Sequence, residues 1–212
     1  MFKLLIGSKN FSSWSLRPWL VLRMLDEPFE EHLVPLYQAD TTERLQSLSP
    51  SAKVPVLFDR QLRIWDSLAI CEYLAECFPA ARLWPDETPR RALARSVVAE
   101  MHAGFGALRS ELPMDVCRSA PAQPRSAACE ADIRRIATLW EDLRSGHLAD
   151  GPFLFGHFTI ADAFFAPVAF RFASYGVTLD GLAQAYQHTL LGLPAMQDWA
   201  KAARSETQPA SA

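Results

Sequence analysis

Several patterns that carry metal or redox chemistry are missing from this chain. It has four cysteines, Cys71, Cys77, Cys117 and Cys129, and no two of them form a C-x-x-C pair. It has five histidines, and no zinc-site spacing occurs. These absences argue against a zinc site or a dithiol centre. We expect no metal, and four reduced thiols buried inside the protein.

Long apolar runs and blocks of basic charge are missing as well. No apolar stretch approaches the roughly 18 residues that a membrane span needs. The start, Met1 to Gly7, has an apolar run too short for a secretory signal, and no basic stretch precedes it. The formal net charge is -3, which argues against a nucleic-acid partner. We therefore expect a cytoplasmic protein that binds neither membrane nor nucleic acid.

The first 80 residues alternate between short apolar runs and helical patterns. Strands are predicted at residues 2–6, 29–35, 53–58 and 62–65, and helices at residues 15–27, 42–48 and 68–78. Ser15 is expected to cap the first helix, with Pro18 in its first turn. The order predicts an α/β layer with a mixed sheet over residues 1–80.

The rest of the chain has no convincing strand pattern. Residues 81–89 contain two prolines and are predicted to be a linker. Helices are expected at residues 92–112, 130–144, 159–175, 182–191 and 195–203, the third of them apolar enough to be buried. The sequence thus predicts an all-helical domain over residues 90–205 and a disordered tail over residues 206–212.

Two dipeptides have both a structural and a functional interpretation. Val54-Pro55 opens a strand, and its bond is either an ordinary trans bond or a cis bond that turns the Val54 backbone toward an extended peptide. Asp66-Ser67 opens a helix, where either residue is a good cap. The same pair, with the free N–H groups of the helix start, suits the carboxylate and ammonium of an amino-acid head.

Serines follow the first strand, in the run Ser12-Ser13-Trp14-Ser15-Leu16-Arg17. Such serines commonly form turns and caps. The alternative is that one hydroxyl donates a hydrogen bond to a bound thiolate, which lowers the thiol pKa from its ordinary value of about 8.5. A separate run, Thr159-Ile160-Ala161-Asp162, predicts a capping box with a purely structural role.

Taken in order, these motifs resemble those of the cytosolic glutathione S-transferases over nearly the full length of the chain. The matching segments are residues 12–17, 53–57, 66–74 and 156–162. The resemblance implies an α/β thioredoxin-like N-terminal domain that binds glutathione, plus an all-α C-terminal helical domain that holds an electrophile. It also implies a homodimer, with glutathione as co-substrate and no metal.

The resemblance assigns a role to each residue of the glutathione site. It implies that the Val54-Pro55 bond is cis and that Val54 pairs with the cysteinyl backbone of glutathione. Asp66 and Ser67 bind the γ-glutamyl end, and Lys53 is placed to meet the glycyl carboxylate.

The serine loop narrows the class. The loop contains neither the cysteine of omega-like members nor the tyrosine of alpha-, mu- and pi-like members, and it is most similar to zeta and theta members. Matching Arg17 to the zeta arginine puts Ser12 at the catalytic serine and Ser13 beside it. Two departures are Trp14, in place of a cysteine, and Asp66, in place of glutamate or glutamine. The first weakens an assignment as a maleylacetoacetate isomerase.

The resemblance places the second substrate against the helix predicted at residues 92–112. Met101, His102, Phe105 and Arg109 are candidates to line a pocket for a small hydrophobic electrophile. The alternative for Met101 and Phe105 is that they pack in the core. The alternative for His102 is a buried ring whose nitrogens are hydrogen-bonded within the protein. The implied function is a glutathione transferase. The alternatives are a non-catalytic interaction or stress-response module and a maleylacetoacetate isomerase-like enzyme.

Overall fold

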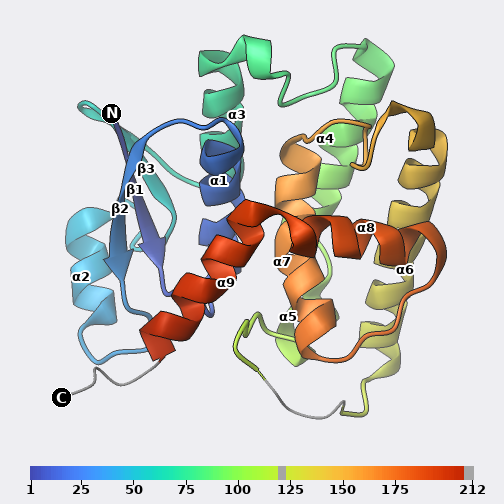
Figure 1. Cartoon of the computed structure of the whole chain (residues 1–212). Coiled ribbons are helices and arrows are strands. Elements are labelled where there is room, and N and C mark those ends of the chain that lie inside the picture. Colours follow the sequence, from blue (N-terminus) through green and yellow to red (C-terminus); the bar gives the residue numbers. More distant parts are fainter. Residues whose placement is uncertain (119–122, 208–212) are drawn as a thin grey trace.

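Four short strands form one sheet near the N-terminus (Figure 1). They are β1 (Phe2–Gly7), β2 (Phe29–Val34), β3 (Val56–Asp59) and β4 (Leu62–Ile64), in the order β2-β1-β3-β4. β1 and β2 are parallel, whereas β1 with β3 and β3 with β4 are antiparallel. The computed structural model describes residues 1–118 and 123–207, and it confirms the predicted mixed sheet.

Three helices cover the two faces of this sheet: α1 (Ser13–Met24), α2 (Thr41–Leu48) and α3 (Ser67–Cys77). Side chains alternate between the faces of a strand. Leu4 and Ile6 therefore join the main core with α1 and α3, whereas Leu5 packs in a smaller cluster with Leu45 of α2. In Figure 1, α2 lies on the outer side of the sheet, and α1 and α3 lie between the sheet and the other helices.

The second half of the described chain is helical. After a short turn of 3₁₀ helix (Pro79–Ala81), it forms α4 (Thr88–Ala103), α5 (Gly106–Glu111), α6 (Ala127–Gly146), α7 (Ile160–Ser174), α8 (Gly181–Gly192) and α9 (Pro194–Thr207). Residues 160–172 of α7 are all buried, as the sequence predicts. α7 packs against α1, α4 and α8 and so joins the two halves. None of the described helices combines the length and hydrophobicity needed to cross a membrane.

The start of α1 differs from the prediction. Its N-cap is Ser12, whose Oγ accepts a hydrogen bond from the Ser15 backbone N–H at 3.3 Å. The Ser15 hydroxyl is used differently, because its Oγ accepts from the backbone N–H of Gly7 at the end of β1. Pro18 consequently lies inside α1 and not in its first turn. Since proline lacks an N–H, the Trp14 carbonyl four residues earlier has no helical partner there.

The long helix predicted at residues 92–112 is broken in two. α4 ends at Ala103, and Phe105 takes a left-handed backbone conformation with φ of 62° between two glycines, Gly104 and Gly106. Glycine is a poor helix former, which favours a break at this point. The new start of α5 is satisfied from outside, because the Leu108 N–H donates to Asp132 of α6 at 3.0 Å.

The predicted capping box at the start of α7 is confirmed. The Thr159 side chain accepts from the backbone of Asp162, and the Asp162 side chain accepts from the Thr159 backbone N–H at 2.7 Å. Asp162 is fully buried. This box fixes where the central helix begins.

The last helix returns to the sheet domain, crossing in front of α1 in Figure 1. The Trp199 indole donates to the Lys9 carbonyl at 2.8 Å, and the Glu206 carboxylate accepts from the Lys9 backbone N–H at 2.8 Å. α9 extends to Thr207, so the disordered tail predicted from residue 206 is wrong for its first two residues. The rest of the predicted tail, residues 208–212, lies outside the described residues.

The cysteines are only partly as expected. All four are free thiols, and Cys71 and Cys129 are buried. Cys77 is exposed at the end of α3 and Cys117 is half-buried, so the expectation that all four are buried is wrong. Cys77 is the last residue of α3, and a short 3₁₀ helix begins at Pro79.

Candidate functional site

Two hollows meet at Trp14, the second residue of α1. One, the Ser67 hollow, has a volume of about 380 Å³ and is lined by Trp14, Ser51, Lys53, Val54, Pro55, Trp65, Asp66 and Ser67. The other, the Arg118 hollow, has a volume of about 510 Å³, and its lining includes Ser13, Trp14, Arg109, Arg118, Arg171 and Tyr175. Because Trp14 lines both, molecules bound in the two hollows would be neighbours.

The Ser67 hollow brings together five residues that the sequence singles out: Lys53, Val54, Pro55, Asp66 and Ser67. The Val54-Pro55 peptide bond is cis. Lys53 is exposed, and Asp66 is the N-cap of α3, with its Oδ1 accepting from the Leu68 backbone N–H at 2.7 Å. The hollow therefore carries a cation, an anion and a helix N-terminus around one volume.

His102 of α4 reaches this site from the helical half. Its Nε2 lies 3.5 Å from Oδ2 of Asp66, and its ring meets Trp14 edge-on with centroids 5.2 Å apart. The Nδ1 atom is buried and has no hydrogen-bond partner within residues 1–118 and 123–207. Burial lowers the pKa of His102; Asp66 opposes this, and the cations Arg17 and Arg109 add to it. This environment favours the neutral ring, which connects α4 to the start of α3.

The two candidate serines make different hydrogen bonds. The Ser12 hydroxyl donates to Ser15 Oγ at 2.7 Å, so its proton is directed into α1. The Ser13 hydroxyl oxygen accepts from Nη2 of Arg171 at 3.2 Å, and Ser13 lines the Arg118 hollow. Ser13 is thus polarised by a cation and retains its own proton for donation, whereas Ser12 is engaged as a cap.

Arg17 is a component that sequence reasoning used only to set the register of the serine loop. Its guanidinium is sandwiched between Trp14 and Phe164, with its carbon 4.2 and 4.3 Å from the ring centroids, and Nη1 donates to Ser67 Oγ at 3.4 Å. Burial, followed by the charge of Arg109, lowers its pKa to about 9. An arginine among the buried apolar residues of α1 was the signal that could have revealed it.

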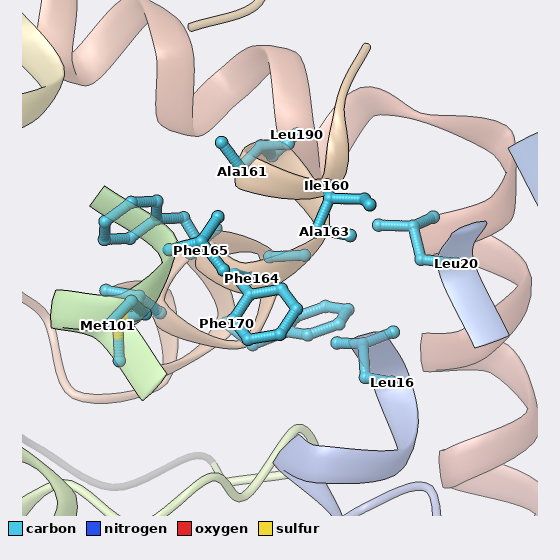
Figure 2. Close-up of a cluster of buried hydrophobic side chains, with 14 of the residues drawn as sticks. Leu16, Leu20, Met101, Ile160, Ala161, Ala163, Phe164, Phe165, Phe170 and Leu190 are labelled. Atoms are coloured by element: carbon cyan, nitrogen blue, oxygen red, sulfur yellow. The ribbon is translucent and has the colours of Figure 1, made fainter. Parts of the chain in front are cut away.

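The residues predicted for the second pocket are divided by the break between α4 and α5. Met101 and Phe105 are buried in the core, and Figure 2 shows Met101 in the same buried cluster as the α7 residues Phe164, Phe165 and Phe170. Arg109 lines the Arg118 hollow. Its guanidinium also donates to the carbonyls of Met101 and, at 2.9 Å, Gly104, so it caps the end of α4.

Two further arginines reach the Arg118 hollow, and sequence reasoning did not find either. Arg171 of α7 donates to the Leu112 carbonyl as well as to Ser13. Burial, followed by the charge of Arg109, lowers its pKa to about 10. Arg118 lies with its guanidinium carbon 4.4 Å from the centroid of Tyr175. A cation inside the phenylalanine-rich run of α7 was the available signal for Arg171.

Known proteins are similar to the chain over different lengths. It is 32% identical to a probable maleylacetoacetate isomerase of Caenorhabditis elegans over 48% of this chain and 47% of that protein, so it spans about half the length of that relative. It is 26% identical to the glutathione S-transferase GstB of Escherichia coli K12 over 82% of this chain and 85% of that protein.

A solved structure shows the same fold. It is a glutathione transferase homologue from Burkholderia gl BGR1 with bound glutathione, 24% identical, covering 96% of this chain and 98% of that one with a TM-score of 0.73. Residues 11–77 match the family model of the glutathione S-transferase N-terminal domain, and residues 120–202 match that of the C-terminal domain. With both domains matched and the fold shared, the chain belongs to the glutathione S-transferase family.

Proposed function

We propose that the protein is a glutathione transferase, with glutathione in the Ser67 hollow and the electrophile in the Arg118 hollow. The observation that carries this proposal is the shared Trp14 wall, with Ser12 and Ser13 at the adjoining start of α1. Two substrates on either side of that residue are brought within reach of each other, and such positioning removes much of the entropic barrier of a bimolecular reaction.

The charges of the Ser67 hollow match those of glutathione. The γ-glutamyl ammonium pairs with Asp66, and the γ-glutamyl α-carboxylate meets the Ser67 hydroxyl and the N-terminus of α3. The buried Arg17 guanidinium, 3.4 Å behind that hydroxyl, strengthens the site for an anion. Lys53 pairs with the glycyl carboxylate, and the Val54 backbone pairs with the cysteinyl residue.

A hydroxyl at the start of α1 stabilises the thiolate. A hydrogen bond donated to the charged form lowers the pKa of a thiol, and the positive end of a helix dipole acts in the same direction. The sequence ranks Ser12 first, but the hydrogen bonds favour Ser13, because Ser12 already donates to Ser15. The thiol proton leaves to solvent, and sulfur attacks the electrophilic carbon. With a halide leaving group, the C–S bond forms as the C–halogen bond breaks.

A glutathione-dependent isomerase is the second candidate. Its support is the 32% identity to a probable maleylacetoacetate isomerase. In that reaction the thiolate adds to a cis double bond and is eliminated again after rotation, so glutathione is not consumed. Incubation with maleylacetoacetate distinguishes the two, because isomerisation leaves the concentration of free thiol unchanged.

The proposal is tested by calorimetric titration with glutathione, using wild type and the variants Ser67→Ala, Ser12→Ala and Ser13→Ala. Wild type is expected to bind, and Ser67→Ala to bind about tenfold or more weakly. Ser13→Ala is expected to bind glutathione without lowering its thiol pKa, read from thiolate ultraviolet absorbance against pH. The exposed Ser145 on α6 supplies the matched control Ser145→Ala.

Two results would contradict parts of this proposal. If wild type does not bind at millimolar glutathione, the fold serves a non-catalytic interaction module and the transferase reading is wrong. If Ser12→Ala loses the pKa effect and Ser13→Ala keeps it, the catalytic hydroxyl is Ser12.

Two further features of the proposal concern the protein in the cell. We propose a homodimer, which light scattering coupled to size-exclusion chromatography would measure. The four free thiols fit a reducing compartment, and we propose the cytoplasm.

A further inference from the structure

Three arginines line one hollow, two of them close in the sequence and the third from a distant helix. Arg109 comes from α5, Arg118 from the loop that follows it, and Arg171 from α7. Arg109 and Arg171 each donate to two acceptors within the protein, which does not use all five N–H donors of either guanidinium. Among the residues that the structure describes, the buried Nε of Arg118 has no hydrogen-bond partner. Three guanidinium groups with spare N–H donors thus belong to residues that line the hollow.

These arginines form no ion pair with another part of the described chain. Among the described residues, none of the three has a carboxylate within 4.0 Å. The lining contains one carboxylate, Asp115, which accepts from Asn10 Nδ2 at 2.9 Å. Burial lowers the pKa of Arg109, and the charge of Asp132 on α6 opposes this. The Asp132 carboxylate accepts a hydrogen bond from the Leu108 N–H. Cations held together without counter-charges are unfavourable unless an anion joins them.

Aromatic rings surround the same charges. The Arg109 guanidinium carbon lies 5.0 Å from the Trp14 ring centroid, and that of Arg118 lies 4.4 Å from the Tyr175 centroid. Phe11 and Tyr37 meet edge to face at 5.5 Å on the same lining. Such a site offers flat apolar contact to the body of a ligand and cations to one end of it.

We infer that the second substrate is an acidic electrophile, with an apolar or aromatic body and a carboxylate that Arg109, Arg118 and Arg171 recognise. This inference rests on the proposed function and adds an acidic group to the small hydrophobic electrophile that the sequence predicts. A planar guanidinium matches a carboxylate with two parallel hydrogen bonds, so a carboxylate is favoured over a spherical anion. The two carboxylates of glutathione do not compete for these arginines, because in the proposed complex they bind to Ser67 and Lys53 in the Ser67 hollow.

The first test needs no glutathione. Wild type is titrated with 3-nitrobenzoate and with 3-nitrobenzamide, which have the same shape and differ in charge. We expect the benzoate to bind about tenfold or more tightly than the benzamide. Arg118→Gln is expected to reduce this preference to about threefold or less, and Arg118→Lys to restore part of it. Arg134→Gln, which removes an exposed arginine of α6 outside both hollows, is the matched control.

A second measurement does not depend on a variant that folds. In wild type, added salt is expected to weaken benzoate binding and to leave benzamide binding unchanged. Equal binding of the two probes by wild type, or a preference that survives in Arg118→Gln, overturns the inference.

The conjugation assay separates this inference from the proposed function. With 4-chloro-3-nitrobenzoate and its amide, the glutathione sulfur forms a bond to the ring carbon, chloride leaves with its electron pair, and the thiol proton goes to solvent. Rate enhancement over the uncatalysed reaction is expected to be greater for the acid. Equal enhancement of both overturns the acidic preference and leaves the transferase intact, whereas failure to bind glutathione removes the transferase but not the benzoate result.

Discussion

Replacement of Asp162 by asparagine tests how far one buried carboxylate holds the central helix in place. Its Oδ1 accepts from the Leu154 N–H at 3.0 Å and the Tyr186 hydroxyl at 2.9 Å. Its Oδ2 accepts from the Thr159 N–H at 2.7 Å and the Thr159 hydroxyl at 3.0 Å. Burial raises the pKa of Asp162 and these four hydrogen bonds oppose the rise. Each oxygen therefore serves one backbone donor and one hydroxyl.

Because both oxygens of Asp162 have the same kinds of partner, the free-energy cost of Asp162→Asn does not depend on how the amide is turned. Whichever way the asparagine amide is turned, its NH₂ faces one hydroxyl, which can rotate to accept, and one backbone N–H, which cannot. One buried donor is left unsatisfied, so Asp162→Asn is expected to cost about 1–3 kcal/mol of unfolding free energy. Asp162→Ala leaves all four donors without their acceptor, and the resulting cost is close to the whole unfolding free energy of an ordinary domain, about 5–15 kcal/mol. We expect that variant to be recovered unfolded.

The assay is urea unfolding followed by tryptophan fluorescence and circular dichroism. Trp140 is a local reporter, because its ring lies edge-on to Tyr186 with centroids 5.0 Å apart. Asp198→Asn is the control, since it removes the same charge from an exposed ion pair with Arg23 and is expected to change the midpoint little. If Asp162→Asn unfolds at the same urea concentration as the control, the carboxylate does not hold the helix start and the reasoning is refuted.

Three further predictions concern pH, backbone strain and thiol exposure. Burial lowers the pKa of His102 below 6.5, so the stability that the neutral side chain contributes is complete above pH 6.5 and is lost as the pH falls toward the folded-state pKa. Between pH 7 and pH 5, the urea midpoint of His102→Gln should therefore fall less than that of wild type. Gly156 has a φ of 90°, and a Cβ added there would lie 2.6 Å from a neighbouring carbon, so Gly156→Ala should lose about 1–3 kcal/mol of unfolding free energy. A Cβ added at Gly106 meets no atom within 4 Å, so Gly106→Ala should lose none, and equal urea midpoints for the two variants would contradict this. Iodoacetamide should label exposed Cys77 well before buried Cys71, read by mass spectrometry of peptides, and the reverse order counts against the structure.

Local features of this fold could be predicted from the sequence because their determinants lie within a few residues of one another. The Thr159 to Asp162 capping box spans a single helical turn, and the residues that start α3, Asp66 and Ser67, are adjacent. Alternating side chains assign Leu4 and Leu5 to opposite faces of the sheet. Lys53, Val54, Pro55, Asp66 and Ser67, five of the residues that line the Ser67 hollow, also come from two short segments, so the sequence resemblance could name them together.

Two local features could not be predicted, because more than one structure fits the sequence at each of them. Ser12 and Ser15 are both good caps, and the choice between them depends on which hydroxyl the end of β1 requires. Gly104 and Gly106 favour a break, but the apolar spacing on either side favours one long helix, and the contact that satisfies the new helix start comes from Asp132 of another helix.

What the sequence alone determined was the family, the mixed sheet, the buried helix and five of the residues that line the Ser67 hollow. What only the tertiary structure decided was the charge of the second hollow and the difference between the two serines. Ser13 and Arg171 are 158 residues apart, and Arg171 of α7 joins Arg109 of α5 and Arg118 of the loop that follows α5. Electrostatic interaction depends on distance in space, and no periodicity along the chain records that distance.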